Sequence, residues 1–254
     1  MSLPRRLPIA AFAVVAVLGS AAVWAPPAAG ADAPADCPAP AGLMQDTAKL
    51  PHLRARLAAR QPIEIVAIGG ASTAGKAAGS PDLAYPRRLQ EALVRFYPGL
   101  PITVANKGVP RQSAAEMLAR FPRDVLALHP VQVIWEVGIA DAVRGTETDD
   151  FATALETGIA RLKVRGIDVI LMDMQFSRDV AAIIDFDSYL QALRRVAEIE
   201  DVAVFPRFEI MRSWSEEGVF HFDGVAPGER ARLASRVYRC LGEALAKMIR
   251  RAVR

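Results

Sequence analysis

The chain alternates between short apolar runs and longer segments with helical periodicity, and this alternation constrains the fold more than any other feature. The runs are rich in valine and isoleucine, as buried strands are. They occupy residues 63–68, 102–104, 131–137, 167–172 and 202–205, and the helical segments occupy residues 82–97, 112–128, 149–165, 188–198 and 229–250. Apolar strands separated by helices form a mostly parallel sheet with helices on both faces. The pattern therefore predicts an α/β fold, a flavodoxin-like three-layer α/β/α sandwich around a mostly parallel, five-stranded sheet.

The N-terminal residues have the features of a secretory signal rather than of a domain. Arg5 and Arg6 precede an uncharged apolar run over residues 7–24, and the small-residue sequence Ala29–Ala31 follows it. A positive region, an apolar region and an A-x-A site together predict cleavage before Asp32. An uncleaved N-terminal anchor is the competing interpretation, since the apolar run is long for a signal. We expect residues 1–31 to be a signal peptide, 32–61 a Pro/Ala-rich N-terminal segment and 62–254 the α/β domain, and we expect the protein to be periplasmic or secreted.

Export changes how the two cysteines are interpreted. Cys37 lies just after the predicted cleavage site, and Cys240 lies in the last helical segment. In an oxidising compartment, two cysteines far apart in sequence most simply form one disulfide. This disulfide would tie the N-terminal segment to the body of the domain. The alternative is one buried thiol and one exposed free thiol.

The charge pattern argues against several kinds of partner and cofactor. The chain has 31 Lys and Arg residues against 28 Asp and Glu, a formal net charge of +3, without a clustered basic stripe. A nucleic-acid binder needs such a stripe, so we expect no nucleic-acid partner.

The turn at Gly69–Gly70 lacks the lysine of a phosphate-binding loop and the full dinucleotide fingerprint. The acidic residues near the strands do not form a ligand set, and we expect no cofactor and no metal.

Function in a parallel sheet concentrates at the carboxyl ends of the strands. Four sequence blocks follow strand ends or precede the last helix: residues 69–75, 106–110, 138–141 and 220–227. In this order they resemble the conserved blocks of the Ser-Gly-Asn-His (SGNH, GDSL-type) hydrolases, a family of esterases and acylhydrolases. The resemblance extends over about residues 63–245 and implies an SGNH hydrolase-like domain over residues 62–254. The matching positions are Gly69, Thr73, Gly75, Gly108, Gly138, Asp141, Asp223 and Pro227.

Three reactive positions of the family pattern carry alanine in this chain. By the resemblance, Ala71 occupies the nucleophile position, Ala140 the position of the oxyanion-hole asparagine, and Ala226 the position of the catalytic histidine. The implied oxyanion-hole glycine, Gly108, and the orienting carboxylate, Asp223, are retained. Acyl transfer needs a hydroxyl nucleophile, a base and donors for the oxyanion, and a methyl group supplies none of these. We therefore expect a catalytically degenerate protein that binds a small molecule, such as an acyl ester or a saccharide, or a partner protein.

A rearranged catalytic set is the alternative hypothesis. Ser72 lies one residue after the nucleophile position, and His221 lies two residues before Asp223. A Ser72–His221 pair oriented by Asp223 or Asp141 would make the protein an active esterase or acylhydrolase on an acylated saccharide or lipid. The simpler interpretation is that Ser72 and Thr73 stabilise the turn or cap the next helix, and that Asp141 caps a turn. In either case we expect a monomer, without a stable membrane anchor once the signal is cleaved.

The signal hypothesis predicts where the mature chain begins. Protein recovered from outside the cytoplasm should start near Asp32, because the A-x-A site lies at Ala29–Ala31. N-terminal sequencing of the exported protein measures this directly. An intact Met1 on protein in the membrane fraction would show that the segment is an anchor instead.

Overall fold

The apolar runs form a single five-stranded sheet in which every neighbouring pair of strands is parallel. The strand order is β2-β1-β3-β4-β5, the flavodoxin-like order, and it confirms the predicted fold class. Because β2 and β3 both lie beside β1, the chain changes direction between β1 and β3, which is where ligands bind in such sheets. The strands are β1 (Ile63–Gly69), β2 (Ile102–Gly108), β3 (Gln132–Glu136), β4 (Asp168–Met172) and β5 (Ala203–Phe205).

The structure is a computed structural model, and it describes residues 37–38, 41–44 and 49–254. The chain divides into two units, residues 1–34 and 35–254, and the predicted signal segment 1–31 lies outside the described residues. The predicted N-terminal segment 32–61 lies partly outside them. Within the described residues, the helices are too short or too polar to cross a bilayer.

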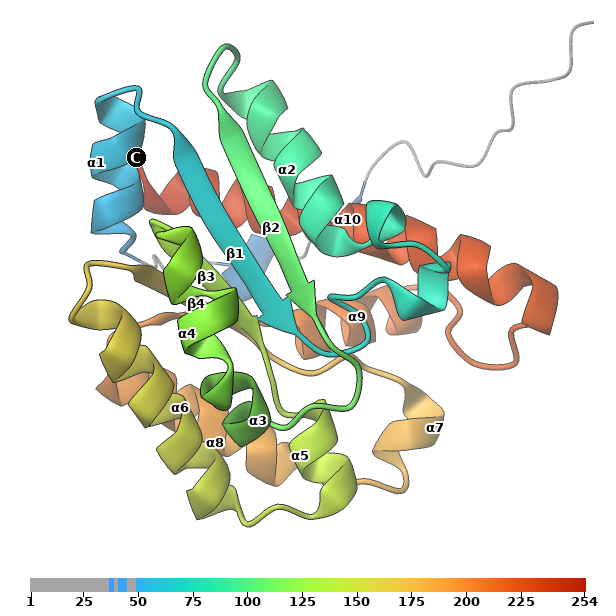
Figure 1. Cartoon of the computed structure of the whole chain (residues 1–254). Coiled ribbons are helices and arrows are strands. Elements are labelled where there is room, and N and C mark those ends of the chain that lie inside the picture. The colour runs from blue at the N-terminus through green and yellow to red at the C-terminus, as the bar shows by residue number, and fades with distance from the viewer. Residues whose placement is uncertain (1–36, 39–40, 45–48) are drawn as a thin grey trace, which may run out of the picture. The chain divides into compact units, whose positions relative to one another are not determined.

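Helices cover both faces of the sheet (Figure 1). Helices α2 and α10 pack together on one face, while α3, α6 and α8 pack together on the other. The helices are α1 (Pro51–Ala58), α2 (Tyr85–Phe96), α3 (Ala114–Ala119), α4 (Phe121–Asp124), α5 (Ile139–Arg144), α6 (Thr148–Lys163), α7 (Arg178–Ala181), α8 (Phe186–Ile199), α9 (Arg207–Glu216) and α10 (Arg230–Ala252).

Small residues set the spacing of the helix layers. A Cβ atom on Gly242 of α10 would lie 2.6 Å from Cβ of Arg88 and 2.8 Å from the backbone nitrogen of Leu89 in α2. A Cβ atom on Gly158 of α6 would lie 2.4 Å from the ring of Trp135 in β3. Both approaches are closer than real side chains allow, so glycine at these positions lets the layers reach native packing density.

The structure differs from the expectations at one predicted helix and at four helices that were not predicted, α1, α5, α7 and α9. The segment 112–128, predicted as one helix, is broken into α3, α4 and a 3-10 turn, because Pro122 cannot continue the hydrogen bonds of α3. Helix α1 lies inside the predicted Pro/Ala-rich N-terminal segment, and its proline stands at the first helical position, where a missing N–H costs nothing. Helix α9 was also missed, and it supplies part of the site described below.

The predicted disulfide is present between Cys37 and Cys240, with the two Cα atoms 5.0 Å apart. It fastens residues near the N-terminus to α10. A second contact supports the same attachment, because the indole N–H of Trp214 in α9 donates a hydrogen bond to the carbonyl oxygen of Pro38. The N-terminal strap, residues 37–38, thus contacts both α9 and α10.

Replacing Cys37 with serine should lower the free energy of unfolding by roughly 2–4 kcal/mol, since the disulfide restricts the unfolded chain. Chemical denaturation of the oxidised wild type and of Cys37→Ser, in the same buffer, measures the difference. The reduced wild type is the matched control and should resemble the variant. Equal midpoints for the oxidised wild type and the variant would contradict the prediction.

Candidate functional site

The turn after β1, residues 70–75, is called the β1 turn, and one buried carboxylate holds it in place. Glu136, the last residue of β3, is 1% exposed and accepts hydrogen bonds from the backbone N–H of Thr73, at 2.9 Å, and from the hydroxyl of Thr73. The Thr73 hydroxyl also lies 3.1 Å from the hydroxyl of Tyr85. Burial and the nearby charge of Glu136 together raise the pKa of Tyr85, so this phenol stays neutral.

The same carboxylate pairs with a buried arginine. The Nη1 atom of Arg207, the first residue of α9, lies 3.1 Å from Oε1 of Glu136, and both side chains are 1% exposed. Arg207 follows the end of β5, so the pair links α9 to β3 and, through Glu136, to the β1 turn. The Nε and Nη2 atoms of Arg207 are buried without a hydrogen-bond partner among the described residues.

Gly108 lies in close contact with the β1 turn. It is opposite Gly69 in the register of β1 and β2, and a Cβ atom on it would lie 2.2 Å from the backbone nitrogen of Ala74. Asn106 reinforces the contact, because its side-chain amide donates to the Thr73 carbonyl at 2.6 Å and accepts from the Gly108 N–H at 2.9 Å. A side chain at position 108 would push the turn away, so glycine here has a packing role.

Asp141 also has a structural role in this fold. It is 1% exposed, and its carboxylate oxygens lie 3.1 and 3.2 Å from the backbone N–H of Ala114, the first residue of α3. Desolvation raises the pKa of Asp141, and the backbone hydrogen bonds partly oppose this rise. Ala140, its neighbour in α5, is 8% exposed.

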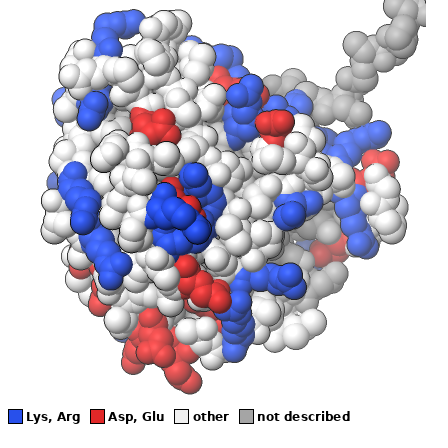
Figure 2. Space-filling view, viewed as in Figure 1, with Lys and Arg blue, Asp and Glu red and all other residues white. Residues whose placement is uncertain are grey.

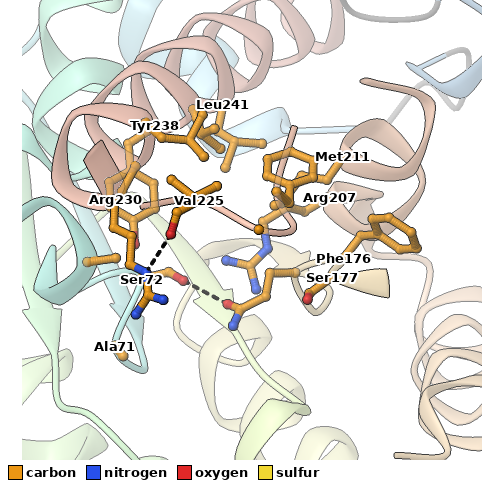
Figure 3. A pocket seen from close by; sticks show the side chains of 17 residues that line it. Ala71, Ser72, Phe176, Ser177, Arg207, Met211, Val225, Arg230, Tyr238 and Leu241 are labelled. Atoms are coloured by element: carbon orange, nitrogen blue, oxygen red, sulfur yellow. Dashed lines mark hydrogen bonds between the residues drawn. The ribbon is translucent and has the colours of Figure 1, made fainter. Parts of the chain in front are cut away.

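A pocket of about 430 Å³ opens beside the β1 turn (Figure 3). Its size is in the range usual for small-molecule sites. Its walls come from the β1 turn, the segment after β4, helices α9 and α10, and the loop before α10. The lining residues are Ala71, Ser72, Ala77, Gln175, Phe176, Ser177, Arg207, Met211, Phe222, Gly224, Val225, Arg230, Leu233, Ala234, Val237, Tyr238 and Leu241.

Some of the predicted site residues meet at this pocket and others do not. Ala71 and Ser72 line it, and the loop that contains Ala226 contributes Gly224 and Val225. The other candidates, Gly108, Ala140, Asp141, His221, Asp223 and Ala226, are not among its lining residues.

Ser72 is engaged by polar partners other than histidine. Its hydroxyl donates a hydrogen bond of 2.9 Å to Oε1 of Gln175. It also interacts with the hydroxyl of Tyr238, whose pKa burial raises. His221 is exposed, and Oδ1 of Asp223 is buried with no hydrogen-bond partner in the described part of the chain. Ser72 and Thr73 do not cap the next helical turn, whose N-cap is Gly75; their hydroxyls bond instead to the side chains of Gln175 and Glu136, and the Glu136 contact holds the turn in place.

Arg207, Gln175 and Tyr238 line the pocket but were not predicted as site residues from the sequence. Gln175 follows the end of β4 and Arg207 follows the end of β5. The rule that function concentrates at the carboxyl ends of the strands therefore also points to these two residues. Tyr238 carries no such signal, since it lies within the apolar periodicity of α10. Within the described residues, there is no group of three or more His, Cys, Asp or Glu side chains that would hold a metal ion.

The fold and the motif order agree with the comparisons to known proteins. The model of the non-GDSL lipase-like family matches residues 36–254. The chain belongs to this family, which confirms the predicted relationship to GDSL-type hydrolases. Comparison with curated proteins gave no match.

Solved structures of GDSL-type proteins and esterases share the fold. A putative lipolytic protein of the G-D-S-L family from Desulfitobacterium hafniense is 21% identical, with a TM-score of 0.58 over 73% of this chain and 98% of that one. A variant of Axe2, an acetyl xylan esterase from Geobacillus stearothermophilus, is 20% identical, with a TM-score of 0.59 over 74% and 94%. A two-domain esterase active on acetylated mannans is 18% identical, with a TM-score of 0.64 over 81% and 55%.

Asp173 gives the site a testable pH dependence. It is fully buried next to Arg207, its Oδ1 atom accepts from the Phe208 N–H at 2.8 Å, and desolvation raises its pKa from 3.8 to about 7. Between these two values the folded protein keeps a proton that the unfolded chain has released. The free energy of unfolding should therefore fall as the pH rises from about 4 to about 7.

Asp173→Asn should remove this loss, because an amide does not ionise and its oxygen still accepts from Phe208. Urea unfolding of both proteins at pH 5 and pH 8 provides the comparison. The wild type should lose more stability over that interval than the variant does. A parallel change in the two proteins would contradict the raised pKa.

Proposed function

We propose that this protein is an exported, catalytically degenerate member of its family that acts by binding a small molecule in the retained pocket. The observation that carries the proposal is the identity of the three reactive positions. Ala71, Ala140 and Ala226 stand where the resemblance implies nucleophile, oxyanion-hole amide and catalytic histidine. Loss of one member of a catalytic triad already removes several orders of magnitude in rate.

The retained motif residues support the same proposal, since their contacts account for them without catalysis. Thr73 donates a hydrogen bond to Glu136, and Gly108 leaves room for the backbone of Ala74. The carboxylate of Asp141 accepts a hydrogen bond from the first backbone N–H of α3. Residues with a packing role are therefore kept, while residues whose only role is chemical are replaced. Asp223 is the exception to this division, because it is retained although its Oδ1 atom is buried with no hydrogen-bond partner in the described part of the chain.

The pocket also supports the proposed binding function, because a cavity lies beside Ala71, at the implied nucleophile position. Ala71 contributes a methyl group to its wall, and most of the other lining residues are apolar. Pockets of this composition bind ligands mainly through apolar burial, with a few polar groups that fix orientation. An acyl-bearing ligand suits such a wall better than a saccharide does, although active relatives include esterases on acetylated xylan and mannan.

Export to the periplasm or the cell exterior is part of the proposal. The Cys37–Cys240 disulfide is compatible with an oxidising compartment, and the N-terminal sequence resembles a signal peptide. We propose a monomer that binds its ligand without a nucleic-acid partner, cofactor or metal. On the face that Figure 2 shows, basic and acidic side chains are interspersed, without a continuous basic stripe.

The wild type should show no ester hydrolysis above buffer with a chromogenic short-chain ester, and Ala71→Ser alone should not change this. A serine hydroxyl is a weak nucleophile without a base, and the histidine position still carries Ala226. Restoring all three positions, by Ala71→Ser, Ala140→Asn and Ala226→His, should gain more than the product of the single effects, because such groups act as a unit. The asparagine alone is worth about 10²–10³ in rate when the rest of the set is present.

The alternative, an esterase that uses Ser72, His221 and Asp223, predicts the opposite result. Wild-type turnover that Ser72→Ala or His221→Ala abolishes would overturn the binding proposal. The matched control is Ser177→Ala, since Ser177 lines the same pocket but belongs to no proposed catalytic set.

A further inference from the structure

The pocket has an unbalanced set of charged groups. Arg207 and Arg230 line it, and the lining contains no aspartate or glutamate. Figure 3 shows both arginine side chains at the same cavity, with Ser72 and Tyr238 near them. Glu136 compensates the charge of Arg207 from behind the pocket, whereas Arg230 is exposed and its Nε atom donates to the Val225 carbonyl oxygen at 3.1 Å. These three groups give the pocket one uncompensated positive charge.

Arg207 presents an unused edge with a defined geometry. Glu136 occupies its Nη1 atom, while Nε and Nη2 are buried with no partner in the part of the chain that the structure describes. A buried donor without an acceptor costs free energy, so an acceptor at this edge would be favourable. The Nε–H and Nη2–H bonds of a guanidinium point the same way and match the two oxygens of a carboxylate.

The carboxyl group of Asp173 does not take up the open edge of Arg207. Asp173 is fully buried and interacts electrostatically with Arg207, and its own Oδ2 atom also lacks a partner. Desolvation raises the pKa of Asp173 to about 7, so below neutral pH its carboxyl group is mainly uncharged. A neutral Asp173 leaves the positive charge of the pocket available to a ligand.

The rest of the pocket is an apolar surface on one helix face. Leu233, Val237 and Leu241 recur at intervals of four along α10, so they form one stripe that lines the cavity. Met211 of α9 and Phe176 after β4 extend the apolar surface on the other side. A hydrocarbon chain that lies along this stripe removes apolar area from water on both partners.

We propose that the pocket binds a singly charged amphiphile, whose carboxylate is held by Arg207 and Arg230 and whose hydrocarbon tail lies along the α10 stripe. This inference rests on the proposed binding function and adds the chemical class of the ligand. One negative charge balances the pocket, and one carboxylate matches the open edge of Arg207. Since Nε and Nη2 are shielded from solvent, the carboxylate reaches them only when a neighbouring lining side chain turns aside.

Titration calorimetry with three probes separates the two parts of the ligand. Octanoate carries both head and tail, 1-octanol carries the tail alone, and acetate carries the head alone. At pH 6.5 octanoate should bind at least about tenfold more tightly than either partial probe, because a charge-assisted hydrogen bond to a buried group contributes on that scale. Equal affinity for octanoate and octanol would overturn the inference, and so would no heat from any probe.

Variants test the assigned residues. Arg230→Gln should weaken octanoate binding by roughly three- to tenfold, while Arg232→Gln, an exposed arginine of the same helix outside the pocket lining, should leave it unchanged. Ala234→Phe should abolish binding, because the larger side chain fills the cavity that Ala234 lines. Arg207→Lys keeps a positive charge beside Glu136 but removes the paired Nε–H and Nη2–H donors. Octanoate should therefore bind this variant about tenfold more weakly.

Thermal melts establish that each variant is folded, and Arg230→Gln and Ala234→Phe decide the question if Arg207→Lys unfolds. Unchanged octanoate affinity in both of these variants would overturn the inference. Hydrolysis of an ester by the wild type would refute the proposed function, whereas octanol binding as tight as octanoate binding would refute only the carboxylate.

Discussion

The site depends on the buried carboxylate of Glu136. From the end of β3, it accepts the backbone and hydroxyl hydrogen bonds of Thr73 and pairs with Arg207. It therefore fixes the β1 turn and the start of α9 relative to each other, on both sides of the point where the sheet changes direction. Removing one partner of such a buried pair typically costs 3–5 kcal/mol, because the remaining charge is left uncompensated. These Glu136 interactions link two walls of the pocket, the β1 turn and α9.

This constraint explains why motif residues at the strand ends have a packing role in a chain with alanine at positions 71, 140 and 226. Thr73 and Gly108 lie in the contacts that hold the turn, so substitution there would disturb packing. Ala71 instead contributes only a methyl group to the pocket wall. The proposed loss of catalysis is therefore compatible with the family fold, since fold and function depend on different residues at the same strand ends.

Much of the fold was predictable because its signals are local. The five apolar runs gave the strands, their alternation with helices gave the parallel sheet, and Cys37 and Cys240 gave the disulfide. The sheet order and the α9 helix were harder, since they depend on packing between distant segments. The Glu136–Arg207 pair connects positions 71 residues apart, and no local sequence pattern around either residue predicts the pairing. Tyr238 lines the pocket because α10 forms one of its walls, which its position in the sequence does not show.

The most direct test of the account is the intact mass of the wild-type protein after incubation with a phosphonate probe for activated serines, followed by an octanoate titration of the same sample. The account predicts an unmodified mass and undiminished octanoate binding, because Ser72 donates its hydroxyl hydrogen to Gln175 and lacks a histidine base. A stoichiometric adduct on Ser72 would contradict it, since such an adduct requires an activated nucleophile in the pocket.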